Sequence, residues 1–234
     1  MKAENTGPRV AKSTQRPGRP AKNHRRRDIR EKLLDVAEQL FAEEGFHVVT
    51  MQQIAQSASV TKALLHYYFE DKRGLLSAVF ARRAEYIDRL QKRALERYEK
   101  KAQGRMTLDG IIRANMRVAF RIVGSGKRLR NFTALQAQLN NTPGWGTAIM
   151  ADFNPGIQRI ASLIQKVYPN VPIEDIYWGM LQFSGALGLT MARTGRIDQW
   201  SNGSCRSDDL QAARPRVVAY AIGGLGAICE NAQR

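Results

Sequence analysis

Residues 62–69 carry side chains whose chemistry suits contact with phosphates and base edges. Leu65 and Phe69 suffice to anchor this segment as a helix, and a lysine, a histidine and two tyrosines crowd the rest of its surface. Lysine and tyrosine can reach phosphate oxygens, and together with histidine they can bond to the major-groove edges where base pairs differ. The polar side chains are Lys62, His66, Tyr67 and Tyr68. The alternative interpretation is a solvated helix with a tyrosine-rich packing edge.

Capping residues place this segment on the second of two short helices. Thr50 and Gln53 form a Thr-x-x-Gln capping box, which predicts a helix that begins near Met51. Residues 57–59 then interrupt the apolar pattern, and Thr61 supplies the N-cap hydroxyl of the next helix. Two short helices joined by a turn of three to four residues are typical of a helix-turn-helix.

Further motifs across residues 29–80 extend this pattern on both sides of the turn. A preceding helix is indicated by apolar residues at helical spacing that stop at Gly45. Its inward stripe consists of Ile29, Leu33, Val36, Ala37, Leu40 and Phe41. The motif residues after it are Ile54, Ala55, Val60, Thr61, Lys62, Tyr67, Tyr68, Phe69, Lys72, Leu75 and Leu76. Together they resemble the signature of the TetR family of one-component bacterial regulators.

This resemblance implies a set of DNA contacts, position by position. The implied contacts are Thr50, Thr61 and Lys72 with phosphates, Lys62 and Ala63 with base edges, and His66 and Tyr67 with base or backbone. Helix starts favour anions through their unpaired amides and the macrodipole, which suits the three phosphate positions. Each of those three residues could instead be only a cap or a first-turn residue.

Three residues depart from the usual pattern of the family. Ser59 stands where a turn glycine is usual, Ala63 where glycine is frequent, and His66 where tyrosine is usual. Histidine changes the donors and acceptors that face the groove, and the Ala63 methyl group could contact thymine. We therefore expect His66 to influence sequence preference more than overall affinity.

The charge of the chain indicates an anionic partner such as nucleic acid. The formal net charge is +16, and residues 1–27 contribute +8 of it through nine basic side chains and one acid. This segment lacks an apolar period, so we expect a disordered basic arm. Around Arg16 and Arg19 it resembles the Gly-Arg-Pro core of an AT-hook, which binds an A·T-rich minor groove. A nonspecific basic arm is the alternative.

The resemblance implies an all-α fold in two domains. A three-helix helix-turn-helix domain is expected at residues 28–76, and a larger helical domain for ligand binding and dimerisation at 77–234. Apolar periodicity predicts one long helix across 71–101 that links them. The later helices are predicted at 108–123, 127–140, 145–168 with a break at Pro155, 172–194, and 208–231 with a bend at Pro215. Residues 200–204 are interpreted as a connecting loop.

Small residues cluster in the last two predicted long helices, where they would let helices approach closely. They are Gly179, Ser184, Gly185, Ala186 and Gly188 in one helix, and Ala219, Ala221, Gly223, Gly224, Gly226 and Ala227 in the other. The resemblance implies that these helices pair with those of a second subunit in a homodimer. Close packing within the chain is the alternative. A two-fold dimer would set two recognition helices about 34–36 Å apart, matching the half-sites of a palindromic operator.

The middle helices combine bulky apolar side chains with a few polar ones, as small-molecule pockets do. The expected lining residues are Asn115, Met116, Phe120, Phe132, Gln136, Trp145, Phe153, Tyr177, Trp178, Gln182 and Phe183. Each aromatic residue among them could instead be ordinary core. We expect a largely apolar or amphipathic effector that moves the long helix by preferring one conformation.

Catalytic and metal-binding patterns are missing from the sequence. The histidines at 24, 47 and 66 are scattered, and neither a phosphate-cradling glycine loop nor a His-Glu-x-x-His pair is present. No enzyme activity, cofactor or metal is therefore expected. Cys205 and Cys229 fit no zinc or redox spacing, and no signal peptide or membrane span is indicated. The predicted location is the cytoplasm, in association with the nucleoid.

These patterns predict a homodimeric, ligand-responsive transcription factor, most simply a repressor that covers double-stranded DNA at a palindromic operator. The alternative mode of regulation is activation by the ligand. The competing interpretation is an architectural protein that binds DNA through its charge, with little sequence selectivity and no response to small molecules. A helical enzyme acting on a small molecule is a third. None of the motifs specifies the effector or the operator.

Overall fold

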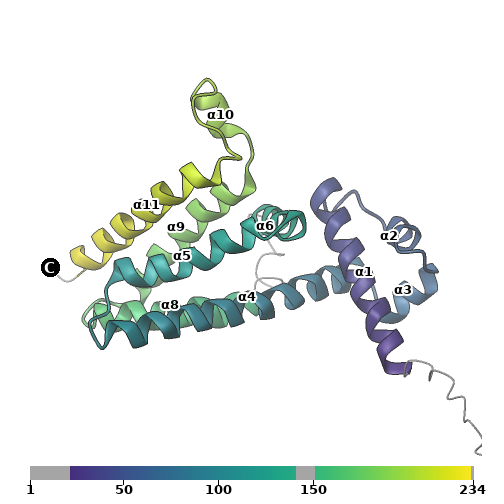
Figure 1. Cartoon of the computed structure of the whole chain (residues 1–234), viewed down its shortest axis with the longest axis horizontal. Coiled ribbons are helices and arrows are strands. Elements are labelled where there is room, and N and C mark those ends of the chain that lie inside the picture. Colours follow the sequence, from purple (N-terminus) through teal and green to yellow (C-terminus); the bar gives the residue numbers. More distant parts are fainter. Residues whose placement is uncertain (1–21, 141–150, 233–234) are drawn as a thin grey trace, which may run out of the picture.

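The computed structural model describes residues 22–140 and 151–232, and within these ranges every regular element is helical (Figure 1). The elements are α1 (Lys22–Glu44), α2 (Met51–Ser57), α3 (Lys62–Tyr68), α4 (Lys72–Ala102), α5 (Leu108–Gly124), α6 (Lys127–Asn140), the 3₁₀ turn η1 (Ala151–Phe153), α8 (Asn154–Val167), α9 (Ile173–Ala192), α10 (Arg196–Trp200) and α11 (Leu210–Asn231). The all-α fold class is confirmed. No described helix has the length and apolar character needed to cross a membrane.

The first three helices enclose a small apolar core. Leu33, Phe41 and Leu65 have no exposed surface, and the other members of the predicted α1 stripe lie in or against the same core. α1 ends at Glu44 because Gly45 adopts a left-handed φ of +90°, while its amide still donates to the Phe41 carbonyl at 3.1 Å. The sequence-predicted first helix and its end at glycine are therefore confirmed.

The turn between α2 and α3 passes through a serine in the left-handed region. Ser59 has a φ of +53°, and the Val60 amide returns to the Ala55 carbonyl at 3.0 Å. For a residue with a Cβ, this conformation costs about 1–2 kcal/mol. Ser59 therefore adopts a turn geometry that glycine would supply without this conformational cost.

α4 runs through both parts of the molecule and carries the packing of each (Figure 1). Near its start it packs against α1, and further along it contacts α5 and α8. α9 and α11 pack against each other, and α11 also rests on α5. In Figure 1 the α9–α11 pair lies on the side of α5 away from α4.

The apolar core is continuous across residue 76, where the sequence suggested a domain boundary. One cluster runs from Leu33 on α1 through Phe80 on α4 to Phe132 and Leu139 on α6. The ring centroids of Phe80 and Phe132 are 5.1 Å apart. A second cluster fills the space between the far half of α4 and helices α5, α8, α9 and α11. α6 thus shares a core with the helix-turn-helix unit.

The start of α1 differs from the sequence-based expectation. Residues 22–27 were expected in the disordered arm, but α1 begins at Lys22 and includes them. The last helix breaker before this point is Pro20, and lysine and arginine are good helix formers. The helix therefore begins before the apolar stripe does.

The break expected at Pro155 falls where α8 begins, directly after the 3₁₀ turn η1. Pro155 lies in the first turn of α8, where its missing amide hydrogen has no helical partner to lose. Pro215 lies inside α11, which nevertheless continues to Asn231. The short helix α10 was not predicted, because five residues are too few to show an amphipathic period.

Candidate nucleic-acid interface

Side-chain caps fix where α2 and α3 begin. The Thr50 hydroxyl oxygen accepts from the Gln53 amide at 3.2 Å, and the Thr50 amide donates to Gln53 Oε1 at 2.8 Å, which confirms the predicted capping box. The Thr61 hydroxyl oxygen accepts from the Leu64 amide at 3.2 Å. These caps set the first turn of each helix and hence which side chains of α3 point outward.

The outward face of α3 gathers the residues that were expected at DNA. Leu65 is fully buried beneath the helix, whereas 67% of Tyr67 is exposed. The expected contact residues that lie exposed on this surface are Thr61, Lys62, Ala63, His66 and Tyr67, and Thr50 is exposed at the start of α2. Tyr68 is half-buried, with its ring edge-on to that of Tyr67. The resulting surface is short, polar and free of acidic side chains.

His66 has a defined hydrogen-bonding state on this surface. Its Nδ1 lies 2.8 Å from the Glu70 carbonyl oxygen, and because a carbonyl can only accept, Nδ1 carries the proton. In the neutral ring Nε2 is then an acceptor. An acceptor suits the amino groups of adenine or cytosine in the major groove, with which a tyrosine hydroxyl at this position would bond differently.

Lys72 does not lie with the exposed contact residues, and its ammonium group has internal partners in the structure. Its Nζ donates to the carbonyl oxygens of Phe46 at 2.8 Å, His47 at 3.3 Å and Val49 at 2.7 Å, and lies 4.5 Å from the centroid of the Phe46 ring. An ammonium group has three donors, and all three are used here. Burial lowers the pKa of this ammonium, while the carbonyl oxygens favour its charged form. Lys72 therefore fastens the α1–α2 connection to the start of α4.

Three sequence-predicted site residues fall outside the described ranges. They are Arg16 and Arg19 of the basic arm and Trp145 of the expected ligand set. The AT-hook interpretation and a pocket role for Trp145 therefore stay predictions.

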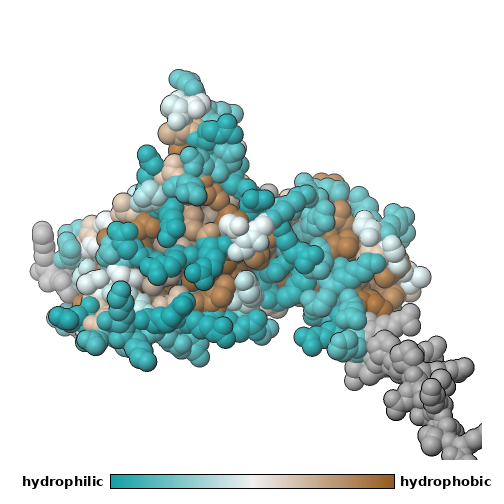
Figure 2. Space-filling model, viewed as in Figure 1, coloured by the Kyte–Doolittle hydropathy of each residue, from teal (hydrophilic) through white to brown (hydrophobic). Residues whose placement is uncertain are grey.

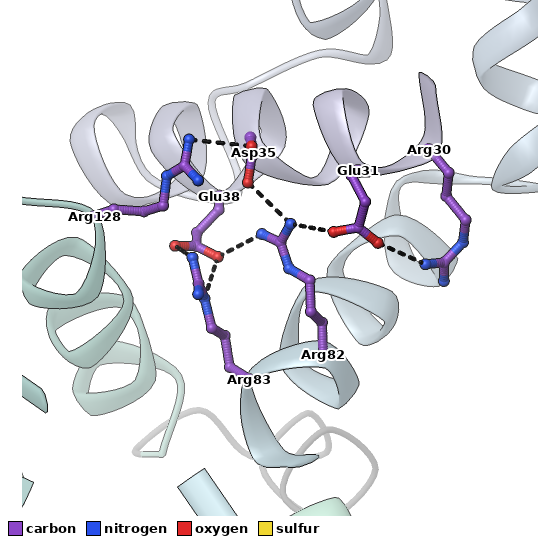
Figure 3. Close-up of polar contacts among 7 residues, drawn as sticks. All are labelled: Arg30, Glu31, Asp35, Glu38, Arg82, Arg83 and Arg128. Carbon is purple, nitrogen blue, oxygen red and sulfur yellow. Dashed lines mark hydrogen bonds and ion pairs between the residues drawn. The ribbon is translucent and has the colours of Figure 1, made fainter. Parts of the chain in front are cut away.

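An ionic seam around the buried Glu38 joins α1 to α4 (Figure 3). The side chain of Glu38 is only 1% exposed; its Oε2 accepts from Arg82 at 2.9 Å and from Arg83 Nε at 2.7 Å, and its Oε1 from Arg83 at 2.6 Å. Arg82 also donates to Glu31 at 3.0 Å and Asp35 at 2.9 Å. Burial lowers the pKa of the Arg82 guanidinium, but the bonds to Glu31 and Glu38 outweigh it and raise the pKa overall.

This seam was missed in the sequence, although it left a signal. Glu31, Asp35 and Glu38 are spaced i, i+4 and i+7, so they share one face of α1. Carboxylates in such a row are usually solvated. These carboxylates pair with arginines only because α4 packs against α1.

The start of α6 reaches the same face of α1 through more exposed pairs. Arg128 lies 3.1 Å from Asp35, and Lys127 lies 2.8 Å from Glu43, with the basic side chains 61% and 71% exposed. Figure 3 shows Asp35 between Arg82 and Arg128, so one carboxylate links α1 to both other helices. A hollow of about 230 Å³ lies there, lined by Asp35, Glu38, Gln39, Lys127, Arg128 and Asn131. It contains none of the expected ligand residues and is too charged for an apolar effector.

The expected ligand residues divide into two groups. One group is buried or half-buried in the second domain: Asn115, Met116, Phe120, Phe132, Gln136, Phe153 and Phe183. Tyr177, Trp178 and Gln182 instead lie exposed on the outer side of α9, with 42% of Tyr177 and 62% of Trp178 accessible. Their assignment to an interior pocket is therefore not supported, because these three side chains are exposed.

A polar pair lies within the buried group. Asn115 is 5% exposed and its Oδ1 accepts from Gln91 Nε2 at 3.0 Å, which joins α5 to α4. Phe132 and Phe153 pack with Phe80 of α4, at 5.1 Å and 6.4 Å between ring centroids. These residues act as core in the structure, and through α4 they are connected to the helix-turn-helix unit.

The arrangement of a capped helix-turn-helix on a helical second domain defines a class, the helix-turn-helix transcription regulators. Family models match both parts: "Bacterial regulatory proteins, tetR family" covers residues 33–79, and "Tetracyclin repressor-like, C-terminal domain" covers residues 113–224. The chain belongs to the TetR family of transcriptional regulators. Proteins of these families are regulators and not enzymes.

Individual relatives are similar over about a third of this chain. The HTH-type transcriptional regulator UidR of Escherichia coli is 31% identical over 75 residues, which is 32% of this chain and 35% of UidR. The transposon Tn10 TetC protein of Escherichia coli is 33% identical over 70 residues, 29% of this chain and 36% of TetC. The matched region thus spans about a third of each relative.

Solved structures share the fold over most of the chain. A putative tetR family transcription regulator from Shewanella sp. PV-4 superposes with a TM-score of 0.61 at 18% identity, over 83% of this chain and 96% of that one. The fatty acid degradation regulator FadR from Bacillus halodurans gives a TM-score of 0.57 at 16% identity, over 84% and 95% of the two chains. At such identities the likeness concerns the fold alone.

The two lysines near α3 should respond differently to removal of their charge. We expect Lys62→Met to lower the slope of log affinity for duplex DNA against log salt by about 1, with little change in stability. Lys72→Met should leave that slope unchanged and lower the free energy of unfolding by about 1–3 kcal/mol, because the turn carbonyls lose their donor. DNA titrations at several salt concentrations measure the slope, and urea unfolding measures the free energy of unfolding. An equal loss of slope in the two variants would contradict the internal role of Lys72.

The buried and exposed ion pairs of α1 should differ in energy. Glu38→Ala leaves two half-buried arginines without their shared carboxylate and should lower the free energy of unfolding by about 3–5 kcal/mol. Arg128→Ala, which breaks an exposed pair on the same face of α1, should cost less than about 1 kcal/mol. Urea unfolding followed by circular dichroism compares them. Similar losses of unfolding free energy in the two variants would show that the seam is not the main connection between α1 and α4.

Proposed function

We propose that this protein is a homodimeric, ligand-responsive repressor that binds a palindromic DNA operator through α3. The observation that carries the proposal is the exposed face of α3, on which Lys62, His66 and Tyr67 lie together above a buried Leu65 anchor. Their donors and acceptors suit phosphate oxygens and major-groove base edges. The net charge of +16 supports DNA as the partner and the nucleoid as the place of action.

Glycines that pack against nothing within the chain support dimerisation. A Cβ added at Gly179 would lie 2.6 Å from Leu225 Cδ2, so close packing between α9 and α11 accounts for that glycine. At Gly185, Gly188, Gly223 and Gly224 an added Cβ would meet nothing within 4 Å. Glycine inside a helix costs about 0.5–1 kcal/mol relative to alanine. A partner helix that approaches closely explains why glycine stands at these four positions.

Large apolar side chains share this outer surface with the glycines. On α9 they include Trp178, 62% exposed, Leu181, 61% exposed, and Leu189, 49% exposed; on α11, Tyr220 is 63% exposed. We call these four residues, with Tyr177 and the four open glycines, the outer α9–α11 face. An apolar surface of this kind on a folded domain is typical of a protein interface. Isologous pairing with a second copy would bury it on both subunits.

Gly223 gives a test in which dimer and monomer respond in opposite directions. Gly223→Ala should stabilise the isolated chain by about 0.5–1 kcal/mol, because alanine favours the helix. In a closely packed dimer the added methyl group should raise the dissociation constant at least about tenfold. Sedimentation equilibrium measures this dissociation constant. Gly124→Ala, at an equally open helical glycine on α5, is the control, and equal dissociation constants for all three proteins would contradict the proposed dimer face.

Effector control is proposed to act on α4 from the second domain. An apolar or amphipathic molecule would bind in the second domain near the buried residues Met116, Asn115 and Phe183. A ligand that prefers one arrangement of these helices would shift α4 and α6 and change the separation of the two α3 helices. Distances between spin labels on α3, with and without candidate ligands, would test this coupling. An unchanged distance at saturation would exclude it.

Selection of bound sequences from random duplex DNA at near-physiological salt tests operator recognition. The full chain should recover a palindrome with half-sites about one helical turn or a multiple apart. A version lacking residues 1–21 should recover the same palindrome, with A·T flanks lost only if the arm acts as a hook. His66→Ala should change base preference within the half-site more than total affinity. Salt-dependent binding with no motif would instead favour the architectural function.

A further inference from the structure

α10 and the loop after it form a projecting arm with apolar side chains on its surface. We define the arm as residues 195–209, between the ends of α9 and α11. Trp200 is 70% exposed and Ile197 is 44% exposed, and the two lie about one helical turn apart on α10. The Arg196 guanidinium carbon lies 4.9 Å from the centroid of the Trp200 ring. Exposing two large apolar side chains to water is unfavourable, and it is unusual on so short a surface element.

The arm is braced by its own hydrogen bonds. The Ser207 amide donates to Asp198 Oδ2 at 2.9 Å, and the Cys205 amide donates to the Ser201 hydroxyl oxygen at 2.8 Å. The Gly203 amide reaches the Asp198 carbonyl at 2.8 Å. The bonds from Ser207 lower the pKa of the Asp198 carboxyl group, so Asp198 stays ionised as an acceptor. A preorganised loop loses little conformational entropy when it binds, which favours an interaction role.

The position of the arm suits a second copy of the chain as its partner. Figure 1 shows α10 projecting beyond the α9–α11 pair, on the side away from α4 and α5. Apolar surface also shows near the foot of the arm in Figure 2. A second copy seated on the outer α9–α11 face would therefore lie directly beside the arm. Because the arm joins α9 to α11, it is continuous with that face in the chain as well as in space.

We propose that the arm clasps the partner subunit of the homodimer, with Ile197 and Trp200 buried against the partner. This inference rests on the proposed dimerisation through α9 and α11, which it extends by a second, reciprocal contact. Two-fold symmetry makes the contact occur twice per dimer, so each substitution removes two anchors. Tryptophan is among the residues that most often dominate interface energy, which makes Trp200 the principal anchor.

Sedimentation equilibrium of the full chain tests the arm. Trp200→Ser and Ile197→Ser should each raise the dimer dissociation constant, Trp200→Ser by at least about tenfold. Gln199→Ser, on the same helix and exposed, is the matched control and should leave it unchanged. Circular dichroism should show equal helix content in all three variants. A dimeric wild type whose constant is unaffected by Trp200→Ser would overturn the arm contact while leaving the dimer face intact.

A second measurement uses the exposed Cys205 within the arm as a native attachment point. A maleimide-linked photocrosslinker on Cys205 should give covalent dimers on illumination, and peptide mapping should place the crosslink in the partner subunit. Crosslinks confined to the same chain in a dimeric sample would overturn the proposal. A wild type that stays monomeric at high concentration would instead contradict the proposed function on which the arm contact rests.

Discussion

A carboxylate buried between two helices sets the constraint on which the arrangement of this protein depends. Glu38 has almost no contact with water, and it is balanced by guanidinium groups from Arg82 and Arg83. Moving α1 away from α4 would leave charges buried without a partner, which is far costlier than breaking an exposed pair. The helix-turn-helix unit is thereby tied to the first half of α4, and α3 takes its orientation from that tie.

α6 is joined to the same unit in a different way. It shares the apolar core through Phe132, but its ion pairs to α1, through Lys127 and Arg128, are largely exposed. Exposed pairs contribute little and are screened by salt. α1 is therefore held to α4 by buried ion pairs and to α6 by the shared apolar core, with the exposed pairs adding little. In the proposed function a ligand that displaces α4 or α6 would move the DNA-binding unit with them.

The parts of the site that were predictable from sequence are those that depend on neighbours along the chain. The capping box of Thr50, the cap at Thr61 and the helix end at Gly45 are local bonds or local backbone preferences, and all three were confirmed. The environments of Lys72 and Trp178 were not predictable, because they come from residues distant in sequence. Three carbonyls of the α1–α2 connection capture Lys72, and the packing of α9 on α11 leaves Trp178 outside.

The sequence by itself determined the all-α class, the TetR-family helix-turn-helix and the side chains that its second helix presents, because periodicity and caps act within a few residues. Only the tertiary structure decided that the acidic row of α1 is an ionic seam, that the core continues from α1 to α6, and that four glycines of α9 and α11 face open space. These features arise where separate helices meet or fail to meet. Burial, charge pairing and close approach depend on distances that no local pattern contains.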